Sequence, residues 1–139
     1  MNQQKIGGFT LIELMIALLV MTILAAITYP YYVNYLLKSR RSDAISTISQ
    51  DQIILERCYT QNFSYQACRS LPIFPQTSAQ GFYRITLTNL DATTYTLTAT
   101  SIGNQVKDTT CTSMSINQLN VKTAVDSSGT AQPMCWNPT

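Results

Sequence analysis

The sequence predicts an α+β protein in which one long N-terminal helix, kinked at a proline, packs on an antiparallel sheet of about four strands. Three observations lead to this prediction. The run from Phe9 to Leu37 is apolar and contains a single charged residue, Glu13. Apolar residues then recur with helical spacing on one side. Further along, apolar and polar residues alternate as they do in half-buried strands.

The apolar run is long enough to cross a membrane. A bilayer core about 30 Å thick needs roughly 20 apolar residues in a helix. The segment from Phe9 to Tyr29 meets this requirement, and the residues after the run are rich in Thr, Ser and Gln. We therefore expect one transmembrane helix followed by a polar head.

The helix is expected to continue beyond the membrane to about Cys58. A one-sided stripe at helical spacing supports this, formed by Ile45, Ile48, Leu55 and Tyr59, with Gln52 filling the gap. Such a stripe is suited to packing on a sheet. Pro30 removes one backbone hydrogen bond and crowds the preceding turn, so we expect a kink there without a stop.

Three cations, Lys38, Arg40 and Arg41, follow the apolar run. Positive residues usually mark the cytoplasmic flank of a membrane helix, and the N-terminal side offers only Lys5 and the chain amine. Contact with anionic lipid headgroups or with acidic neighbours is one interpretation of the cluster. A solvated helix surface is the interpretation we favour.

Residues 58–80 show no clear period and contain two prolines, which indicates a connecting loop. The alternation after them predicts strands at 83–88 and 95–100, joined as a β-hairpin through 89–92. A third strand is expected around Met114 and Ile116, and a fourth at 120–125, followed by a turn at 127–129. The apolar face of this sheet needs a cover, which the helix stripe supplies.

Four cysteines all lie after the apolar run, at positions 58, 68, 111 and 135. An even number outside the membrane indicates disulfides in an oxidising compartment. Four cysteines allow three pairings, and shorter loops cost less to close, which favours Cys58–Cys68 and Cys111–Cys135. A zinc site is the alternative, but no His and no Cys-x-x-Cys pair accompanies them.

The charge of the head argues against non-specific DNA binding. Beyond Ser42 there are five Lys and Arg against six Asp and Glu, a net charge of −1. A DNA-binding head is expected to carry a basic face. Composition gives no support for one, although clustering in three dimensions stays open.

The N-terminal junction inverts the order of an ordinary secretory signal. Such a signal has its small-residue cleavage site after the apolar core. Here a short polar leader ends in Gly7 and Gly8, directly before the apolar run. Cleavage between Gly8 and Phe9 leaves the whole apolar segment on the mature chain, and glycine leaves an extended backbone unobstructed for a protease.

Glu13 is the second unusual feature. A carboxylate in a membrane helix costs about 2.5–3.5 kcal/mol at the centre and less near the end, so a partner is expected. The nearest cation after cleavage is the new α-amine of Phe9, either on the same helix or on a neighbouring subunit. A tolerated carboxylate at the membrane interface is the alternative, and the residues alone do not decide between them.

Residues 8–16, Gly-Phe-Thr-Leu-Ile-Glu-Leu-Met-Ile, closely resemble the processing signal of type IV prepilins. The leader, the long helix, Pro30 and the C-terminal cysteine pair also match that family. The resemblance implies that a prepilin peptidase cuts after Gly8 and N-methylates Phe9. It implies that Glu13 pairs with a neighbour's N-terminus during assembly, and that the helix bends or melts at Pro30 on packing into a filament.

The resemblance divides the chain into a leader (1–8), a transmembrane and filament-core helix (9–37) and a head (38–139). The head is expected in the periplasm while the helix spans the inner membrane, and later on the surface of a pilus. The cysteines and the leader type agree on this orientation. The hairpin pattern and the Cys135-Trp136 ending look like those of minor pilins, in which this ending closes a disulfide loop on the head.

The predicted function is therefore a structural one, a subunit of a type IV pilus and by preference a minor pilin. Its expected partners are other pilins, the prepilin peptidase, an inner-membrane assembly platform and, before assembly, membrane lipid. Such pili support adhesion, twitching motility and sometimes DNA uptake. The alternatives are a pseudopilin of type II secretion and, less favoured, a DNA-binding pilin. An enzyme is the least favoured class, because the sequence has no His, no catalytic triad and no phosphate-binding loop, and we expect no cofactor.

Overall fold

The computed structural model describes residues 8–137, so the predicted leader lies outside the described residues except for Gly8. The chain divides into two compact units, one up to Tyr35 and one from Leu36 onward. The helix α1 (Leu11–Asn62) contributes to both, and the second unit also holds a five-stranded antiparallel sheet. The predicted α+β class is confirmed.

Helix α1 ends four residues later than the predicted Cys58 and passes through Pro30 without a stop. The kink expected at Pro30 stays a prediction. At its C-terminus the next residue, Phe63, has a φ of 53° and donates its backbone N–H to the Tyr59 carbonyl at 2.8 Å. This is a left-handed helix cap at a position that glycine usually occupies. The N-terminal part of α1 is long and apolar enough to cross a membrane, and its most apolar stretch contains no buried residue.

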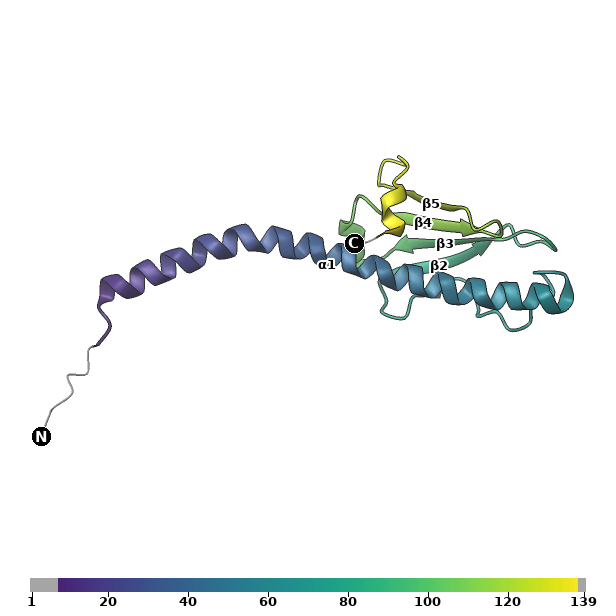
Figure 1. Cartoon of the computed structure of the whole chain (residues 1–139), viewed down its shortest axis with the longest axis horizontal. Coiled ribbons are helices and arrows are strands. Elements are labelled where there is room, and N and C mark those ends of the chain that lie inside the picture. Colours follow the sequence, from purple (N-terminus) through teal and green to yellow (C-terminus); the bar gives the residue numbers. More distant parts are fainter. Residues whose placement is uncertain (1–7, 138–139) are drawn as a thin grey trace, which may run out of the picture. The chain divides into compact units, whose positions relative to one another are not determined.

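The sheet has the spatial order β1-β2-β3-β4-β5, with every neighbouring pair antiparallel. Figure 1 shows β2 to β5 side by side in this order. Its strands are β1 (Gln76–Thr77), β2 (Tyr83–Thr88), β3 (Thr96–Ser101), β4 (Ser113–Asn117) and β5 (Lys122–Val125). The last four match the predicted strands within about two residues. The first strand was missed, because it lies in the segment interpreted as a loop and two residues are too few to show alternation.

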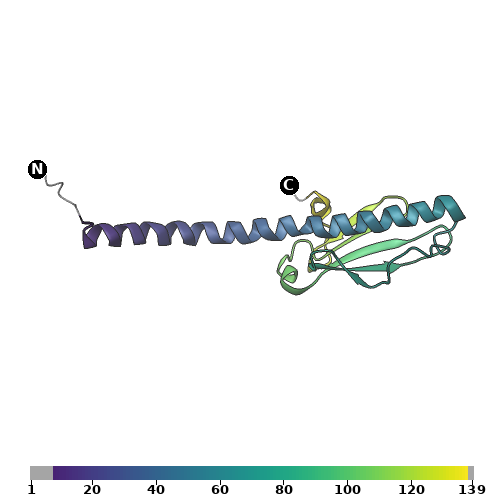
Figure 2. The same cartoon turned by 90° about the horizontal axis from the view of Figure 1, so that it is seen from below.

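The core of the second unit lies between α1 and one face of the sheet. Figures 1 and 2 show this part of α1 running along that face. The register aligns Ile85, Ala99 and Met114 on adjacent strands, and all three are fully buried. From α1, Ile48 and Leu55 are fully buried against them. Each such large side chain contributes about 1.5–3 kcal/mol on burial, so the predicted stripe and the strand alternation together form this interface.

Two disulfides join Cys58 to Cys68 and Cys111 to Cys135, the pairing that the spacing favoured. The C-terminal segment follows the outer edge of β5. Gln132 donates its backbone N–H to the Ala124 carbonyl at 2.8 Å, and the Trp136 indole N–H donates to the Thr123 carbonyl at 2.8 Å. These contacts cover a strand edge that would otherwise present unpaired backbone groups.

Candidate functional site

The predicted cleavage junction lies in exposed, non-helical chain directly before α1. Gly8 has no neighbouring atom within 4 Å of where a Cβ would stand, and the Phe9 side chain is 87% exposed. Within the described residues, the junction is therefore not covered by other parts of the chain. An exposed, non-helical segment of this kind is accessible to a protease.

Thr10 and Glu13 together cap the start of α1. The Glu13 backbone N–H donates to the Thr10 hydroxyl at 3.3 Å, and that hydroxyl donates to the Glu13 carboxylate at 3.5 Å. The Leu14 N–H closes the first helical turn on the Thr10 carbonyl at 3.2 Å. The sequence-based predictions did not include this arrangement, although Thr-x-x-Glu before an apolar run is the sequence signature of a capping box.

The cap leaves the charge of Glu13 uncompensated. Within residues 8–137 the carboxylate contacts no cation, and its contact with the Thr10 hydroxyl is long. In the uncut chain the Phe9 nitrogen belongs to an amide and carries no charge. Cleavage at the predicted junction would convert this amide into an amine four residues before Glu13.

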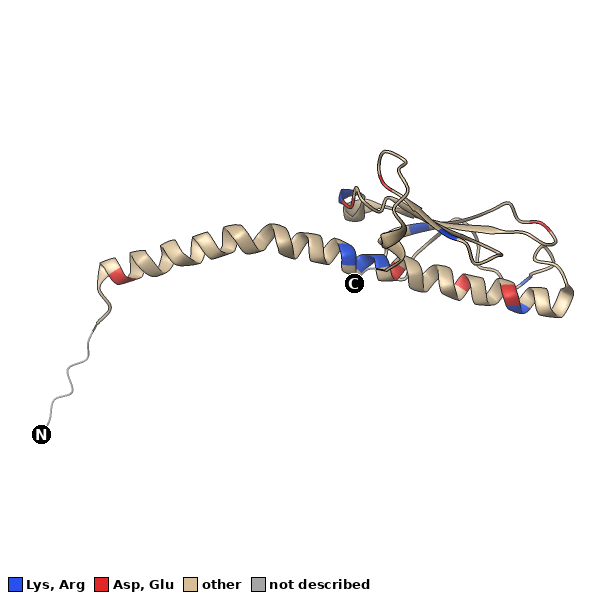
Figure 3. Cartoon of the chain, turned by 45° about the horizontal axis from the view of Figure 1, so that its top comes forward, with Lys and Arg blue, Asp and Glu red and all other residues tan. Residues whose placement is uncertain are grey.

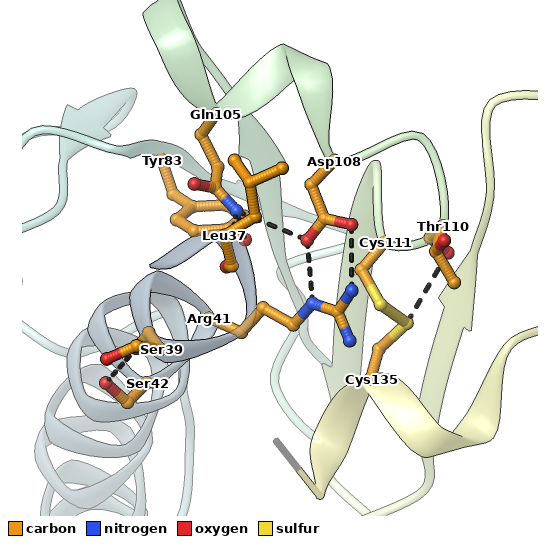
Figure 4. A network of polar contacts seen from close by, with 10 residues as sticks. All are labelled: Leu37, Ser39, Arg41, Ser42, Tyr83, Gln105, Asp108, Thr110, Cys111 and Cys135. Atoms are coloured by element: carbon orange, nitrogen blue, oxygen red, sulfur yellow. Dashed lines mark hydrogen bonds and ion pairs between the residues drawn. A yellow bond between two sulfur atoms is a disulfide. The ribbon is translucent and has the colours of Figure 1, made fainter. Parts of the chain in front are cut away.

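Arg41 corrects the interpretation of the basic cluster as a solvated surface. Its guanidinium forms a two-pronged ion pair with Asp108, with Nε–Oδ2 at 2.7 Å and Nη2–Oδ1 at 2.8 Å, and both side chains are buried. Figure 4 shows Arg41 reaching from α1 to Asp108, which lies three residues before Cys111. Planar guanidinium–carboxylate pairing of this kind is geometrically specific. Of the alternatives for the cluster, contact with an acidic neighbour is correct for Arg41, and the neighbour lies in the same chain.

Gln105 connects this ion pair to the helix and the sheet. Its side-chain amide lies within hydrogen-bond distance of the Leu37 carbonyl (3.0 Å), the Tyr83 hydroxyl (3.1 Å) and the Asp108 carboxylate (3.2 Å). Burial raises the pKa of Tyr83 to about 12, because the low-dielectric interior disfavours the phenolate. The cluster attaches α1 to the C-terminal half of the head at its first buried positions.

Arg40 and Asp43 attach α1 to the β1–β2 turn. The Arg40 guanidinium lies 4.4 Å from the centre of the Phe82 ring, a cation–π contact. The buried Asp43 carboxylate accepts hydrogen bonds from the Ser78 hydroxyl and from the Gln80 backbone N–H at 3.0 Å. The sequence analysis did not single out Asp43, and it interpreted Arg40 as part of a solvated surface, because the partners of both residues are about 40 positions away along the chain.

A second anchor lies near the C-terminal end of α1. The Glu56 carboxylate accepts hydrogen bonds from the Tyr95 hydroxyl at 2.9 Å and from the Tyr65 hydroxyl at 3.2 Å. Tyr65 also stacks on Tyr59, with ring centres 4.6 Å apart. Burial and the neighbouring Glu56 charge raise the pKa of Tyr65 to about 12 and also raise that of Tyr95.

Two family models match this sequence, and together they cover most of the chain. Residues 3–29 match the prokaryotic N-terminal methylation motif. Residues 30–115 match the model described as "Type IV minor pilin ComP, DNA uptake sequence receptor". The chain belongs to this type IV minor pilin family. Membership favours a pilus subunit over the pseudopilin alternative and confirms the resemblance inferred from the N-terminal motif.

The similarity of this minor pilin to curated proteins is confined to part of each chain. It is 41% identical over 61 residues to the type IV major fimbrial protein FimA of Dichelobacter nodosus, which is 44% of this chain and 38% of that protein. It is 37% identical over 68 residues to the prepilin peptidase-dependent protein D of Escherichia coli K12, which is 49% of this chain and 45% of that protein. The minor pilin thus matches less than half the length of these relatives.

In the head of the minor pilin, half of the carboxylates are buried, whereas the cations beyond Ser42 are exposed. Three of its six carboxylates are buried, those of Asp43, Asp51 and Asp108. All five cations beyond Ser42 are exposed, namely Arg57, Arg69, Arg84, Lys107 and Lys122. Figure 3 marks the Lys and Arg positions in blue and the Asp and Glu positions in red along the ribbon. The head beyond Ser42 therefore has a net charge of −1, but among its described residues more cations than anions lie at the surface. Composition alone understated the basic character of the surface, since it counts buried carboxylates together with exposed ones.

Proposed function

We propose that this chain is a minor pilin precursor that is cut between Gly8 and Phe9, methylated at Phe9 and incorporated into a pilus through α1. In this proposal the prepilin peptidase acts at the inner membrane, and an assembly platform there passes the subunit to the filament while the head lies in the periplasm. The observation that carries the proposal is the apolar part of α1. No side chain in its most apolar stretch is buried, so lipid and then neighbouring pilin helices are needed to cover that stretch.

In this proposal, Glu13 makes assembly depend on prior cleavage. The carboxylate lacks a cation in the described residues and lies within the apolar segment, where an unpaired charge is costly. Cleavage creates an amine at Phe9, and a subunit that docks beside another brings amine and carboxylate together. Assembly is then favourable only for processed subunits, because an uncut chain has no amine at that position.

A pair of variants at Glu13 tests the assembly step. We expect Glu13→Ala and Glu13→Gln to be cleaved at a near-normal rate, because neither changes Gly8 or Phe9, and to be depleted from sheared pili. Thr10→Ala is the matched control, since it removes the cap but keeps the carboxylate. Immunoblots of membrane and pilus fractions measure both steps. Normal incorporation of both Glu13 variants contradicts the docking role but leaves the processing proposal standing.

A second candidate function is DNA capture during uptake. The description of the family as a DNA uptake sequence receptor favours it, and so does the exposure of the head's cations. Contacts between Lys or Arg and phosphates make binding depend on salt, because each contact releases counterions. The exposed cations of the head therefore suit weak, salt-sensitive binding to a phosphate backbone.

A gel-shift titration of the mature full-length chain in detergent tests this function. We expect the logarithm of the affinity for duplex DNA to fall linearly with the logarithm of salt concentration. Replacing Arg84, Lys107 and Lys122 by Gln should reduce the slope by about one for each phosphate that is no longer neutralised. The control keeps the charge, with Lys107→Arg and Lys122→Arg. Absence of retardation at low salt, or a slope unchanged by the Gln variants, argues against DNA binding through these cations.

A further inference from the structure

The last residue of the apolar run, Leu37, lies beside a 3-10 helix of the head, η1 (Gly103–Lys107). The Gln105 side-chain amide lies within hydrogen-bond distance of the Leu37 carbonyl, at 3.0 Å. Lys38 follows Leu37 in α1, Lys107 is the last residue of η1, and both lysines are exposed. Two lysines therefore come from segments that are joined where the apolar run ends.

The buried ion pair between Arg41 and Asp108 fixes the orientation of η1. Asp108 directly follows η1 and is buried, as is Gln105, whereas Val106 and Lys107 between them are exposed. Figure 4 shows Gln105 and Asp108 turned towards α1. The short stretch thus directs one apolar side chain, 56% exposed at Val106, and one basic side chain outward.

Three cations gather here without a carboxylate partner. The buried pair just described is the one ion pair within residues 8–137, so Lys38, Arg40 and Lys107 have no counter-ion there. The Arg40 guanidinium lies over the Phe82 ring at 4.4 Å, a contact that leaves its positive charge uncompensated. Together with Val106, these three cations form what we call the basic end of the head.

One accessible carboxylate lies near the basic end, that of Asp126. The Ser127 backbone N–H donates to the Thr109 carbonyl at 2.9 Å, which brings the turn after β5 beside the residues that follow η1. The Asp126 carboxylate accepts hydrogen bonds within its own turn, from the backbone N–H groups of Ser128 and Thr130 at 2.8 and 2.9 Å. Cations therefore outnumber accessible carboxylates among the described residues at this end, a balance that suits an anionic partner.

Lys38 lies where a membrane-spanning α1 leaves the bilayer. At a rise of about 1.5 Å per residue, the helix from its first residue, Leu11, to Lys38 is about 40 Å long. A bilayer with its headgroup layers is about 40–45 Å thick, so Lys38 reaches the far headgroup layer. The Gln105 contact keeps η1, and with it Lys107, beside this position.

We propose that the basic end binds the anionic phospholipid headgroups of the membrane that α1 spans. Lys38, Arg40 and Lys107 pair with lipid phosphates, and Val106 enters the boundary between headgroups and acyl chains. The contact holds the head on the bilayer before assembly and breaks when the subunit enters a filament. The inference rests on the proposed membrane stage of α1 but goes beyond it, because the apolar run alone anchors the chain equally well in a neutral bilayer.

Lysine footprinting of the mature full-length chain in lipid nanodiscs tests this contact. The discs contain phosphatidylcholine alone or mixed with phosphatidylglycerol, and mass spectrometry measures the acetylation rate of each lysine. We expect Lys38 and Lys107 to react at least about fivefold more slowly in the anionic discs and to recover in high salt, which screens the attraction. Lys122, at the start of β5, is the internal control and should react equally in both.

Two variants show whether the cations act together. Lys38→Gln should speed the acetylation of Lys107 in anionic discs by about twofold to fivefold, because one of the attracting charges is lost. Arg57→Gln is the matched control, since it removes an exposed cation from a later part of α1 and should leave Lys107 unchanged. Equal effects of the two variants on Lys107 overturn the proposal.

The remaining outcomes separate this inference from the proposed function. If the chain co-elutes with both kinds of disc and Lys107 reacts equally in them, the headgroup contact is refuted and the membrane stage of α1 stands. Failure to enter either disc contradicts the membrane stage, and this inference with it. Protection of Lys107 by a short DNA duplex in detergent, without protection by anionic lipid, also overturns the proposal and assigns the basic end to nucleic acid.

Discussion

The buried ion pair between Arg41 and Asp108 gives the sharpest prediction about the stability of the head. Arg41→Met removes both charge-assisted hydrogen bonds, 2.7 and 2.8 Å long. Among residues 8–137, it leaves the Asp108 side chain, which is 4% exposed, with the Gln105 amide as the remaining hydrogen-bond partner of its carboxylate. Removing one partner of a buried pair costs about 3–5 kcal/mol, because the other charge stays buried and unpaired. That is a large part of the about 5–15 kcal/mol by which a domain is stable.

The double variant Arg41→Met with Asp108→Leu separates the charge effect from simple loss of packing. Replacing both partners by apolar residues of similar size is often nearly neutral, so we expect it to be more stable than Arg41→Met alone. Urea unfolding of the full-length chain in micelles, followed by the fluorescence of its one tryptophan, Trp136, measures both. Two results refute the reasoning. One is a loss of unfolding free energy below about 1 kcal/mol for Arg41→Met. The other is a double variant whose loss equals the sum of the losses for Arg41→Met and Asp108→Leu measured singly.

Two further predictions concern the anchors between α1 and the sheet. Asp43→Asn should lower the free energy of unfolding by about 1–3 kcal/mol, because the amide cannot replace the carboxylate as acceptor for both the Ser78 hydroxyl and the Gln80 N–H. Asp91→Asn, at an exposed position, is the control. Equal urea midpoints for the two variants contradict the role of Asp43 as an anchor. Stability should also fall at high pH, because the pKa values of Tyr65 and Tyr83 are raised to about 12 in the folded head. These phenols ionise near their usual pKa of about 10 when the chain is unfolded, so their contribution is complete below about pH 10 and is lost as the pH rises through about 12. Urea titrations between about pH 8 and 11.5 check this, and Tyr65→Phe should flatten the decline; an unchanged midpoint across that range argues against buried phenols.

The parts of the fold that depend on local pattern could be predicted from the sequence. Alternation around Tyr83 and Leu97 located β2 and β3, and the apolar run located α1, because these signals come from residues close together in the chain. The polar contacts could not be found in this way. Arg41 lies in a run of cations that has the same sequence appearance whether solvated or buried, and its partner is 67 residues away. The surface charge depends on the same long-range contacts, since they decide which carboxylates are buried.

The candidate assembly site differs from these long-range contacts, because its residues lie close together in the sequence. Thr10 and Glu13 are three positions apart, and their capping arrangement could have been read from the sequence. The sequence did not show which groups contact the Glu13 carboxylate in the uncut chain. Within the described residues its contact is the Thr10 hydroxyl, and no cation lies beside it.

Mass spectrometry of the mature N-terminus tests the central claim, processing at the junction between Gly8 and Phe9, most directly. The chain is purified from the membrane fraction of cells that contain the prepilin peptidase, and from cells that lack it, and the N-terminal peptide is sequenced by fragmentation. We expect a peptide that begins at Phe9 and carries one methyl group on its amine in the first sample, and the uncut leader in the second. An N-terminus at another residue, or an unmethylated Phe9 in the presence of the peptidase, would contradict the account.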